Sequence, residues 1–143
     1  MEASEFSNEK RCLVGFDIGS VSLNTVIMDV DHNIIEDHYD YIHGKPFNVL
    51  KDRLNYILDK YPQESISGIA VTGTGGKLAT DLIGGIFVNE IIAQATATGK
   101  LFPDARTVIE IGGEDSKLIL MEKDSKTGIS RLVDFEMNSI CAA

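Results

Sequence analysis

Two short stretches of the chain place an acid, glycines and hydroxyl side chains between apolar runs. The first is VGFDIGSVSLNTVIMD, residues 14–29, which contains Asp17, Gly19, Ser20 and Ser22. A plain hairpin turn favours Asn-Gly or Asp-Gly, whereas this set is suited to a phosphate group and its metal ion. Glycine lets backbone N–H groups approach phosphate oxygens because it has no Cβ. Hydroxyls can donate further hydrogen bonds, and a carboxylate at a strand end can hold Mg²⁺, usually through water.

The second stretch, VIEIGGEDSKLILM at residues 108–121, repeats the order of the first: an apolar run, an acid, Ile, Gly, small or polar residues and another apolar run. Matching the two stretches pairs three positions, Glu110 with Asp17, Gly112 with Gly19, and Asp115 with Ser22. A repeated turn motif suggests two related domains that face one another. Two such hairpins would grip phosphates from both sides, and hydrolysis would then depend on positioning and electrostatic stabilisation. Two unrelated hairpins that both need glycine are the alternative.

The composition is that of a globular protein and argues against several kinds of partner. The 143 residues, 43% hydrophobic and 24% charged, suit one domain or one domain with part of a second. The net charge of −9 argues against nucleic acid or an anionic membrane surface as a partner. No apolar run approaches the roughly 18 residues that span a bilayer, the N-terminus lacks a signal-peptide core, and the two cysteines form no CxxC motif. We therefore expect a cytoplasmic protein.

The apolar periodicity predicts an α/β layer with a mixed sheet and flanking helices. Strands are expected over residues 12–19, 23–30, 33–42 and 66–73. Helices are expected over residues 46–61, 77–82 and 89–103, the first opened by Pro46 and the last capped by Asn89. After FPDAR, residues 102–106, a strand meander without a helix begins. We therefore expect a flexible lead-in over residues 1–11, a first domain over 12–103 and the start of a second domain over 104–143.

Four motifs in order make the chain similar to a known superfamily: DIGSVSLN, VTGTGG, IEIGGEDSK and MNSICAA. They resemble motifs of the ATPase superfamily of acetate and sugar kinases, heat-shock chaperones and actin. Within that superfamily they look most like the activators of 2-hydroxyacyl-CoA dehydratases and the related ATPase subunits of benzoyl-CoA reductase, and the resemblance extends over residues 13–143. It implies a duplicated ribonuclease-H-like fold that binds ATP between its halves, with the second ATPase-type domain truncated here.

The resemblance implies a role for individual residues around ATP and Mg²⁺. Asp17 matches the metal-associated acid of the first phosphate motif, and Glu110 is its counterpart in the second, so these two would be the catalytic acids. The remaining contacts would come from three loops: Gly19, Ser20, Val21, Ser22 and Asn24 in the first, Thr72, Gly73 and Gly75 in the connecting motif, and Gly112, Gly113, Glu114, Asp115 and Ser116 in the second. Two departures stand out, because members commonly carry Lys at the position of Asn24 and Asp at that of Glu110.

Cys141 matches the first of two cysteines that each subunit of such an activator contributes to a [4Fe-4S] cluster shared across a homodimer. In these activators ATP hydrolysis drives low-potential electron transfer from the cluster to a dehydratase or reductase partner. The second cluster cysteine and the adenosine-binding motif are expected beyond Ala143. Because one good candidate cysteine per chain cannot supply four thiolates, we expect the 143-residue chain to carry no cluster and to be inactive alone.

Two other functions remain open at the level of sequence. A small-molecule kinase of the same superfamily, acting on a sugar or amino sugar, would need a catalytic base for the acceptor hydroxyl. Asp81, after the TGTGG turn, is the one loose candidate for that base. The other alternative is a non-catalytic domain that binds nucleotide or a protein partner inside a larger assembly, towards which Asn24 and Glu110 lean slightly.

Overall fold

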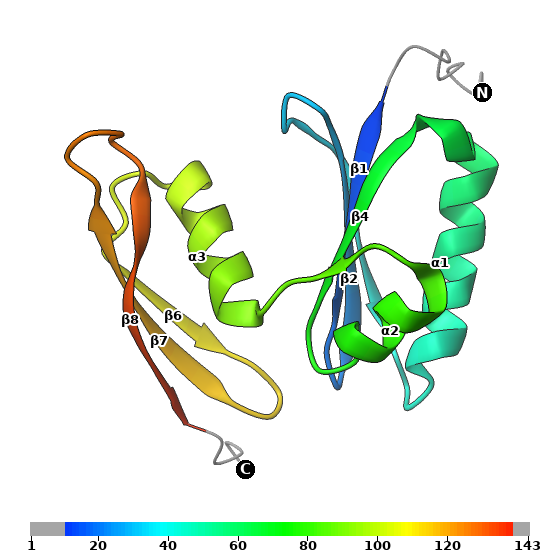
Figure 1. Cartoon of the computed structure of the whole chain (residues 1–143). Helices are drawn as coiled ribbons and strands as arrows, with labels where there is room; N and C mark the ends of the chain where they lie inside the picture. Colours follow the sequence, from blue (N-terminus) through cyan, green and yellow to red (C-terminus); the bar gives the residue numbers. More distant parts are fainter. Residues whose placement is uncertain (1–10, 139–143) are drawn as a thin grey trace. The chain divides into compact units, whose positions relative to one another are not determined.

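The computed structural model describes residues 11–138, and the contacts within the chain divide it between Phe87 and Val88 into two compact units. The first unit contains strands β1 (Cys12–Ile18), β2 (Ser22–Asp29), β3 (Ile34–Tyr41), β4 (Ile66–Thr72) and β5 (Ile86–Phe87), helices α1 (Pro46–Lys60) and α2 (Gly76–Ile83), and the 3-10 turn η1 (Gln63–Ser65). The second contains α3 (Glu90–Leu101), β6 (Thr107–Ile111), β7 (Ser116–Lys123) and β8 (Ser130–Asn138) (Figure 1).

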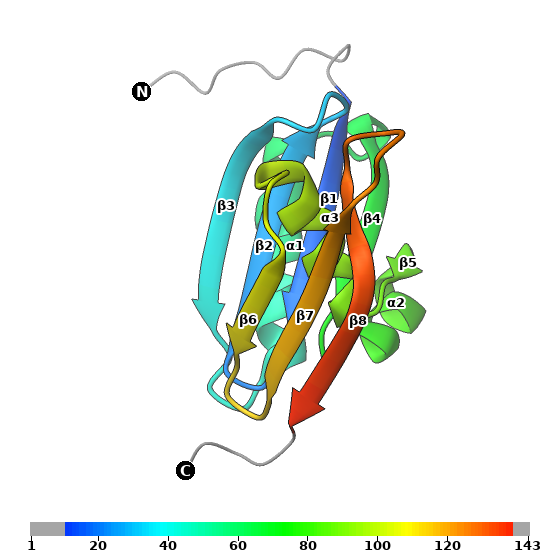
Figure 2. The same ribbon diagram turned by 90° about the vertical axis from the view of Figure 1, so that its left-hand side faces the viewer.

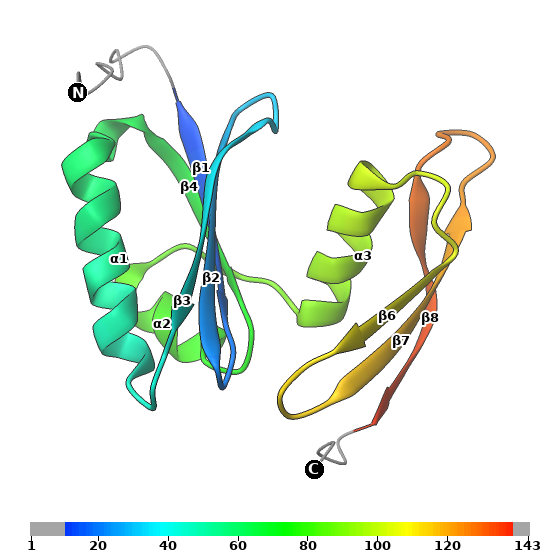
Figure 3. The ribbon, with the colours of Figure 1, turned by 180° about the vertical axis from the view of Figure 1, so that it is seen from behind.

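The first unit is a mixed five-stranded sheet in the order β3-β2-β1-β4-β5, in which β4 runs parallel to β1 and β5 and the other pairs are antiparallel. Helices α1 and α2 lie on the same face of this sheet (Figures 1 and 3). Alternate residues of β1, such as Val14 and Phe16, are buried on that face, as period-2 strands require. The mixed sheet with flanking helices predicted from the sequence is thereby confirmed.

Helix α1 closes the core of the first unit. Pro46 occupies its first turn, where a missing N–H costs nothing, and Leu50 and Ile57 point into the core with 2% and 1% of their surface exposed. The helix ends at Lys60, and the buried Tyr61 follows in extended backbone. The hydroxyl of Tyr61 donates a hydrogen bond to the carboxylate of Glu36 on β3, so the end of α1 is fastened to the edge strand.

The second unit is an antiparallel meander in the order β6-β7-β8, with α3 packed on one of its faces (Figures 2 and 3). Ile91 and Ala95 of α3 form a small separate core with Ile119 and Met121 of β7. The domain limits expected from the sequence, 12–103 and 104–143, assign α3 to the first domain. The contacts group α3 with the second unit instead, because its apolar side chains are buried against that sheet. None of the helices in the described residues is long and apolar enough to cross a membrane.

The two meanders share their internal register. In the first, Asp17 lies opposite Asn24 across the β1–β2 pair, and in the second, Glu110 lies opposite Lys117 across the β6–β7 pair. Both meanders also have a register shift at the equivalent place, after Ile27 of β2 and after Leu120 of β7. Agreement in register and in the position of an irregularity supports the internal repeat that the two sequence stretches indicate.

Candidate phosphate-binding hairpins

The first hairpin joins β1 to β2 by a tight turn. The N–H of Gly19 donates to the carbonyl of Ser22 at 3.0 Å, which leaves Ser20 and Val21 exposed at the tip. Asp17 is the second-to-last residue of β1. It is flanked in register by Asn24 of β2 and Thr72 of β4. The strand order therefore places these three residues side by side on the face opposite α1.

The turn after β4 is built against Asp17. The N–H of Gly75 donates to the carbonyl of Ile18 at 3.0 Å, which draws the loop onto the end of β1. Gly73 has φ +88°, and a Cβ at this position would lie 2.6 Å from Oδ1 of Asp17. Only glycine fits so close to this carboxylate. The structure thus brings together Asp17, Gly73 and Gly75, which the sequence assigned to two separate motifs.

Two polar side chains near Asp17 have notable environments. Oγ1 of Thr72 is buried and has no hydrogen-bond partner among the described residues. An orphaned hydroxyl of this kind is uncommon in a folded protein and is a candidate for contact with a ligand. Nδ2 of Asn24 lies 3.4 Å from Oγ of Ser22 on the same strand. Asn24 therefore places a neutral amide at this position of the hairpin.

The second hairpin closes in the same way as the first. The N–H of Gly112 donates to the carbonyl of Asp115 at 2.8 Å, which corresponds to the bond from Gly19 to Ser22. Gly113 and Glu114 are exposed at the tip, and Ser116 begins β7. The repeat inferred from sequence order therefore extends to the hydrogen bond that forms each turn.

Lys117 is a residue of this hairpin that the sequence interpretation missed. Its Nζ lies 2.6 Å from Oδ1 of Asp115, 2.8 Å from Oε2 of Glu110 and 3.0 Å from Oε2 of Glu90, and its side chain is only 3% exposed. Burial alone would lower the pKa of this ammonium, but hydrogen bonds to Asp115, Glu110 and Glu90 outweigh it and raise the pKa above its usual value. Lys117 is therefore a permanent positive charge within the hairpin.

The other predicted site residues lie elsewhere or outside the described residues. Cys141 falls outside residues 11–138, and Cys12 is buried within β1. Asp81 is exposed on α2. With Lys117 in place among Glu90, Glu110 and Asp115, the described residues contain no group of three or more His, Cys, Asp or Glu side chains that could hold a metal ion by themselves.

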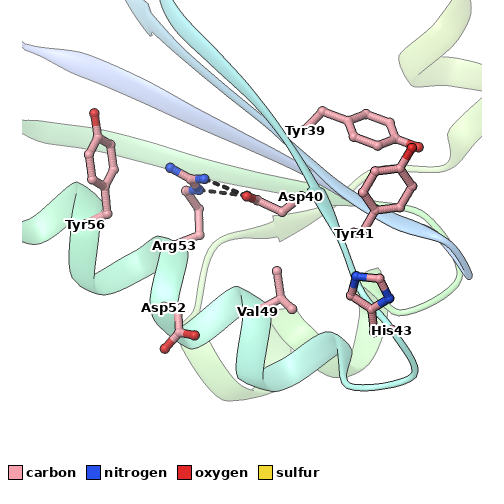
Figure 4. A pocket seen from close by; sticks show the side chains of 8 residues that line it. All are labelled: Tyr39, Asp40, Tyr41, His43, Val49, Asp52, Arg53 and Tyr56. Carbon is pink, nitrogen blue, oxygen red and sulfur yellow. Dashed lines mark hydrogen bonds and ion pairs between the residues drawn. The ribbon is translucent and has the colours of Figure 1, made fainter.

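A surface pocket of about 590 Å³ lies between α1 and β3, and its lining contains none of the predicted site residues (Figure 4). It is lined by Tyr39, Asp40, Tyr41, His43, Val49, Asp52, Arg53 and Tyr56. The guanidinium of Arg53 donates to both carboxylate oxygens of Asp40, at 2.8 and 2.9 Å. This pairing neutralises the cation of the pocket, so the pocket is not an evident anion site.

A mixed sheet with helices on one face, followed by a second meander with the same hairpin, is the arrangement of actin-like ATPases, and solved structures of that fold match the chain. The chain belongs to the BadF/BadG/BcrA/BcrD ATPase family, whose sequence model it matches over residues 14–143. The family resemblance found in the motifs is thereby confirmed.

Two curated relatives carry names that describe a function. The chain is 30% identical over 134 residues to the 2-hydroxyisocaproyl-CoA dehydratase activator of Clostridioides difficile and covers 47% of it. It is 32% identical over 133 residues to the activator of lactoyl-CoA dehydratase of Anaerotignum propionicum and covers 48% of it. Each alignment takes in 91% of the chain, so the chain spans about half the length of these relatives.

Solved structures show the same fold. Component A of (R)-2-hydroxyglutaryl-CoA dehydratase from Acidaminococcus fermentans superposes with a TM-score of 0.77 and 24% identity, over 93% of this chain and 49% of that one. The activator of 2-hydroxyisocaproyl-CoA dehydratase from Clostridium difficile, solved with bound ADPNP, gives a TM-score of 0.72 and 27% identity, over 92% and 47%.

Proposed function

We propose that this chain supplies the two phosphate-binding hairpins of an ATP-hydrolysing activator of a 2-hydroxyacyl-CoA dehydratase or a benzoyl-CoA reductase-type enzyme. The observation that carries the proposal is the repeat of one glycine-closed hairpin, with an acid two residues before Gly19 and before Gly112, in a chain of an ATPase family. Relatives named as dehydratase activators, one of them solved with bound ADPNP, support the choice of nucleotide and of partner.

The exposed turns are the parts that would contact the nucleotide. The backbone N–H groups at the exposed tips of the hairpins would donate to phosphate oxygens; these are Ser20 and Val21 in the first hairpin and Gly113 and Glu114 in the second. The hydroxyl of Thr72, which has no partner among the described residues, could donate to a phosphate bound at the first hairpin. Positioning by such donors is the main contribution that proteins make to phosphoryl transfer.

Magnesium fits the first hairpin. Mg²⁺ keeps several of its waters and binds proteins through one or two carboxylates together with the phosphates of the substrate. Asp17, at the end of β1 and against Gly73, is a carboxylate of this kind, and a larger cluster of ligands is not needed. The ion would neutralise charge that develops on the phosphates, and Asp17 would hold it in place through water.

The iron–sulfur part of the proposal rests on the resemblance of MNSICAA alone. Cys12, the cysteine among the described residues, is enclosed in the core of the first unit and cannot ligate a cluster. Cys141 lies outside the described residues. Electron transfer from a cluster shared across a homodimer is part of the proposal, and iron and sulfide analysis of an anaerobically purified, longer protein would test the cluster.

The ATPase proposal is tested by Asp17→Asn in a polypeptide that combines the chain with the remaining half that its relatives possess. We expect Mg²⁺-dependent ATP hydrolysis to fall by about 100-fold or more, since an electrostatic group of the site is lost, while the circular dichroism spectrum stays unchanged. Asp31→Asn is the matched control, because Asp31 is exposed in the β2–β3 turn. Equal turnover in Asp17→Asn and the control would remove Asp17 from the site.

The kinase alternative gains no support from the described residues. Its candidate base, Asp81, is an exposed residue of α2 and belongs to neither hairpin. Phosphorylation of a sugar in a substrate panel, with loss of the product in Asp81→Asn, would instead support the kinase.

A further inference from the structure

The ammonium of Lys117 is completely coordinated by carboxylates. An ammonium has three N–H donors, and Nζ of Lys117 has three carboxylate oxygens within 3.0 Å, one each from Asp115, Glu110 and Glu90. These oxygens come from the turn of the hairpin, from β6 and from the first residue of α3. Lys117 itself is on β7, so one cation connects four segments of the second unit.

The burial of this group is asymmetric. The side chain of Lys117 is 3% exposed, whereas the side chains of its partners are between 26% and 35% exposed. The positive charge therefore lies inside and the carboxylates surround it towards the solvent. An isolated buried ammonium is costly, and carboxylates held close together repel one another, so the cation and its three partners stabilise one another.

The geometry is that of a small cation site in which the cation is covalently attached to the protein. We propose that Lys117 is the resident counter-cation of the second hairpin: its ammonium takes the position among Glu90, Glu110 and Asp115 that a divalent metal ion would otherwise take. The second hairpin therefore binds no metal ion of its own and contacts phosphate through its backbone. The exclusion of a metal ion from the second hairpin does not depend on the proposed function, whereas the contact with phosphate rests on it.

A free divalent ion cannot easily replace this ammonium. The ion would have to displace a charge that is tethered by its own side chain and cannot diffuse away. Mg²⁺ would also have to exchange tightly held waters for carboxylate oxygens that are already hydrogen-bonded. Lys117 is thus a positioning residue, since it fixes Glu110 and Asp115 on either side of the turn formed by Gly112.

The internal repeat allows the two hairpins to be compared position by position. The position equivalent to Lys117 in the first meander is Asn24, a neutral amide, opposite Asp17. The two hairpins are therefore unequal in charge at a shared register position. We therefore expect the Mg²⁺ of a magnesium nucleotide to bind at the first hairpin, whereas the second hairpin carries the positive charge of Lys117.

The test uses the 143-residue chain and Mn²⁺ alone, without nucleotide, and follows paramagnetic broadening of backbone amide signals. In the wild-type chain, amides of residues 110–117 should stay sharp at Mn²⁺ concentrations up to a few millimolar. Lys117→Met keeps the volume of the side chain and removes its charge. In this variant the same amide signals and that of Glu90 should broaden, and the affinity for Mn²⁺ should be at least tenfold higher than in the wild-type chain. Adding Glu110→Gln to Lys117→Met should abolish the gain.

Lys123→Met is the matched control, because Lys123 is also on β7 but forms a surface pair with Asp104 at 3.0 Å. It should not create a metal site. Broadening of residues 110–117 in the wild-type chain would overturn the inference, and so would a folded Lys117→Met chain that gains no metal. If Lys117→Met does not fold, Lys117→Gln takes its place, because its neutral amide can still donate hydrogen bonds to the carboxylates. Because no nucleotide is present, a failure here is distinct from a failure to bind ATP.

Discussion

Gly73 shows how the position of a functional side chain depends on one backbone conformation. Its φ of +88° lies in the left-handed region, and its Cα faces the carboxylate of Asp17 and the carbonyl of Ile18. The loop can follow this path only because no Cβ is present. The loop after β4 therefore lies against the carboxylate of Asp17. A substitution at Gly73 would change the position of that carboxylate, although the two residues are far apart in the sequence.

Gly73→Ala should therefore lower the free energy of unfolding by more than the usual cost of placing alanine at a positive φ. A non-glycine residue at positive φ costs about 1 to 3 kcal/mol, and here the new methyl group would also clash with backbone and carboxylate atoms. We expect a total loss above about 3 kcal/mol in urea unfolding. Gly44→Ala is the matched control, since Gly44 has φ +74° and no atom beyond its own residue and its two chain neighbours lies within 4 Å of the place that its new methyl group would take. Equal losses in both variants would show that the contact with Asp17 has no energetic weight.

The residues of the site differ in how far the sequence could predict them. Asp17, Gly19 and Gly112 follow from the order of residue types, because an acid, a glycine and a turn are local features. Lys117 does not, because its three partners are brought together by strand register and by the packing of α3. The equal spacing of Asp17 to Asn24 and of Glu110 to Lys117 is the signal that could have found it, once both stretches are taken as hairpins.

At the scale of elements, the edge strand β3 and helix α1 are joined by a cluster around Glu36. Its carboxylate accepts hydrogen bonds from the buried Tyr61, from Tyr56 at 3.0 Å and from Lys60 at 3.1 Å. Burial alone would raise the pKa of Glu36, but the hydrogen bonds from Tyr61, Lys60 and Tyr56 outweigh it and hold the pKa below the usual value of 4.5. The contact between the two elements therefore favours the ionised form.

The lowered pKa of Glu36 makes the stability of the fold depend on pH. Because the pKa of Glu36 is lower in the folded than in the unfolded chain, its contribution is fully present above about pH 4.5 and is lost as the pH falls through the folded pKa. In Glu36→Gln, the urea midpoint should fall less steeply between pH 5 and pH 3 than in the wild-type chain. Glu64→Gln, at an exposed residue of η1, should keep the wild-type slope. A wild-type slope in Glu36→Gln would contradict the assignment.

The elements themselves were largely predictable. The expected helix over 46–61 is α1 at Pro46–Lys60, and the expected short helix over 77–82 is α2 at Gly76–Ile83, because Pro46, the apolar spacing and the glycine-rich turn mark their ends. Strand β5 was missed, since Ile86 and Phe87 are too few to show a period. The partner of α3 could not be predicted either, because a helix of small residues does not reveal which sheet covers it.

At the scale of the whole molecule, residues 11–138 form two separate hydrophobic cores. One is formed by the five-stranded sheet with α1 and α2, and the other by α3 with β7. The four tyrosines all lie between residues 39 and 61, and the chain has no tryptophan. Tyrosine fluorescence therefore reports on the first unit alone, whereas far-ultraviolet circular dichroism reports on both.

Separate cores predict separate responses to mutation. Asn89 caps α3, since its side chain accepts a hydrogen bond from the N–H of Ile91 at 2.9 Å, and loss of such a cap costs about 1 kcal/mol. Asn89→Ala should lower the urea midpoint seen by circular dichroism and leave the tyrosine midpoint unchanged. Asn33→Ala, which removes a 2.9 Å hydrogen bond to Asp29 in the first unit, should instead move the tyrosine midpoint. If Asn89→Ala shifts the circular dichroism and tyrosine midpoints together, the two cores unfold in one cooperative transition. The two units then have no independent stability.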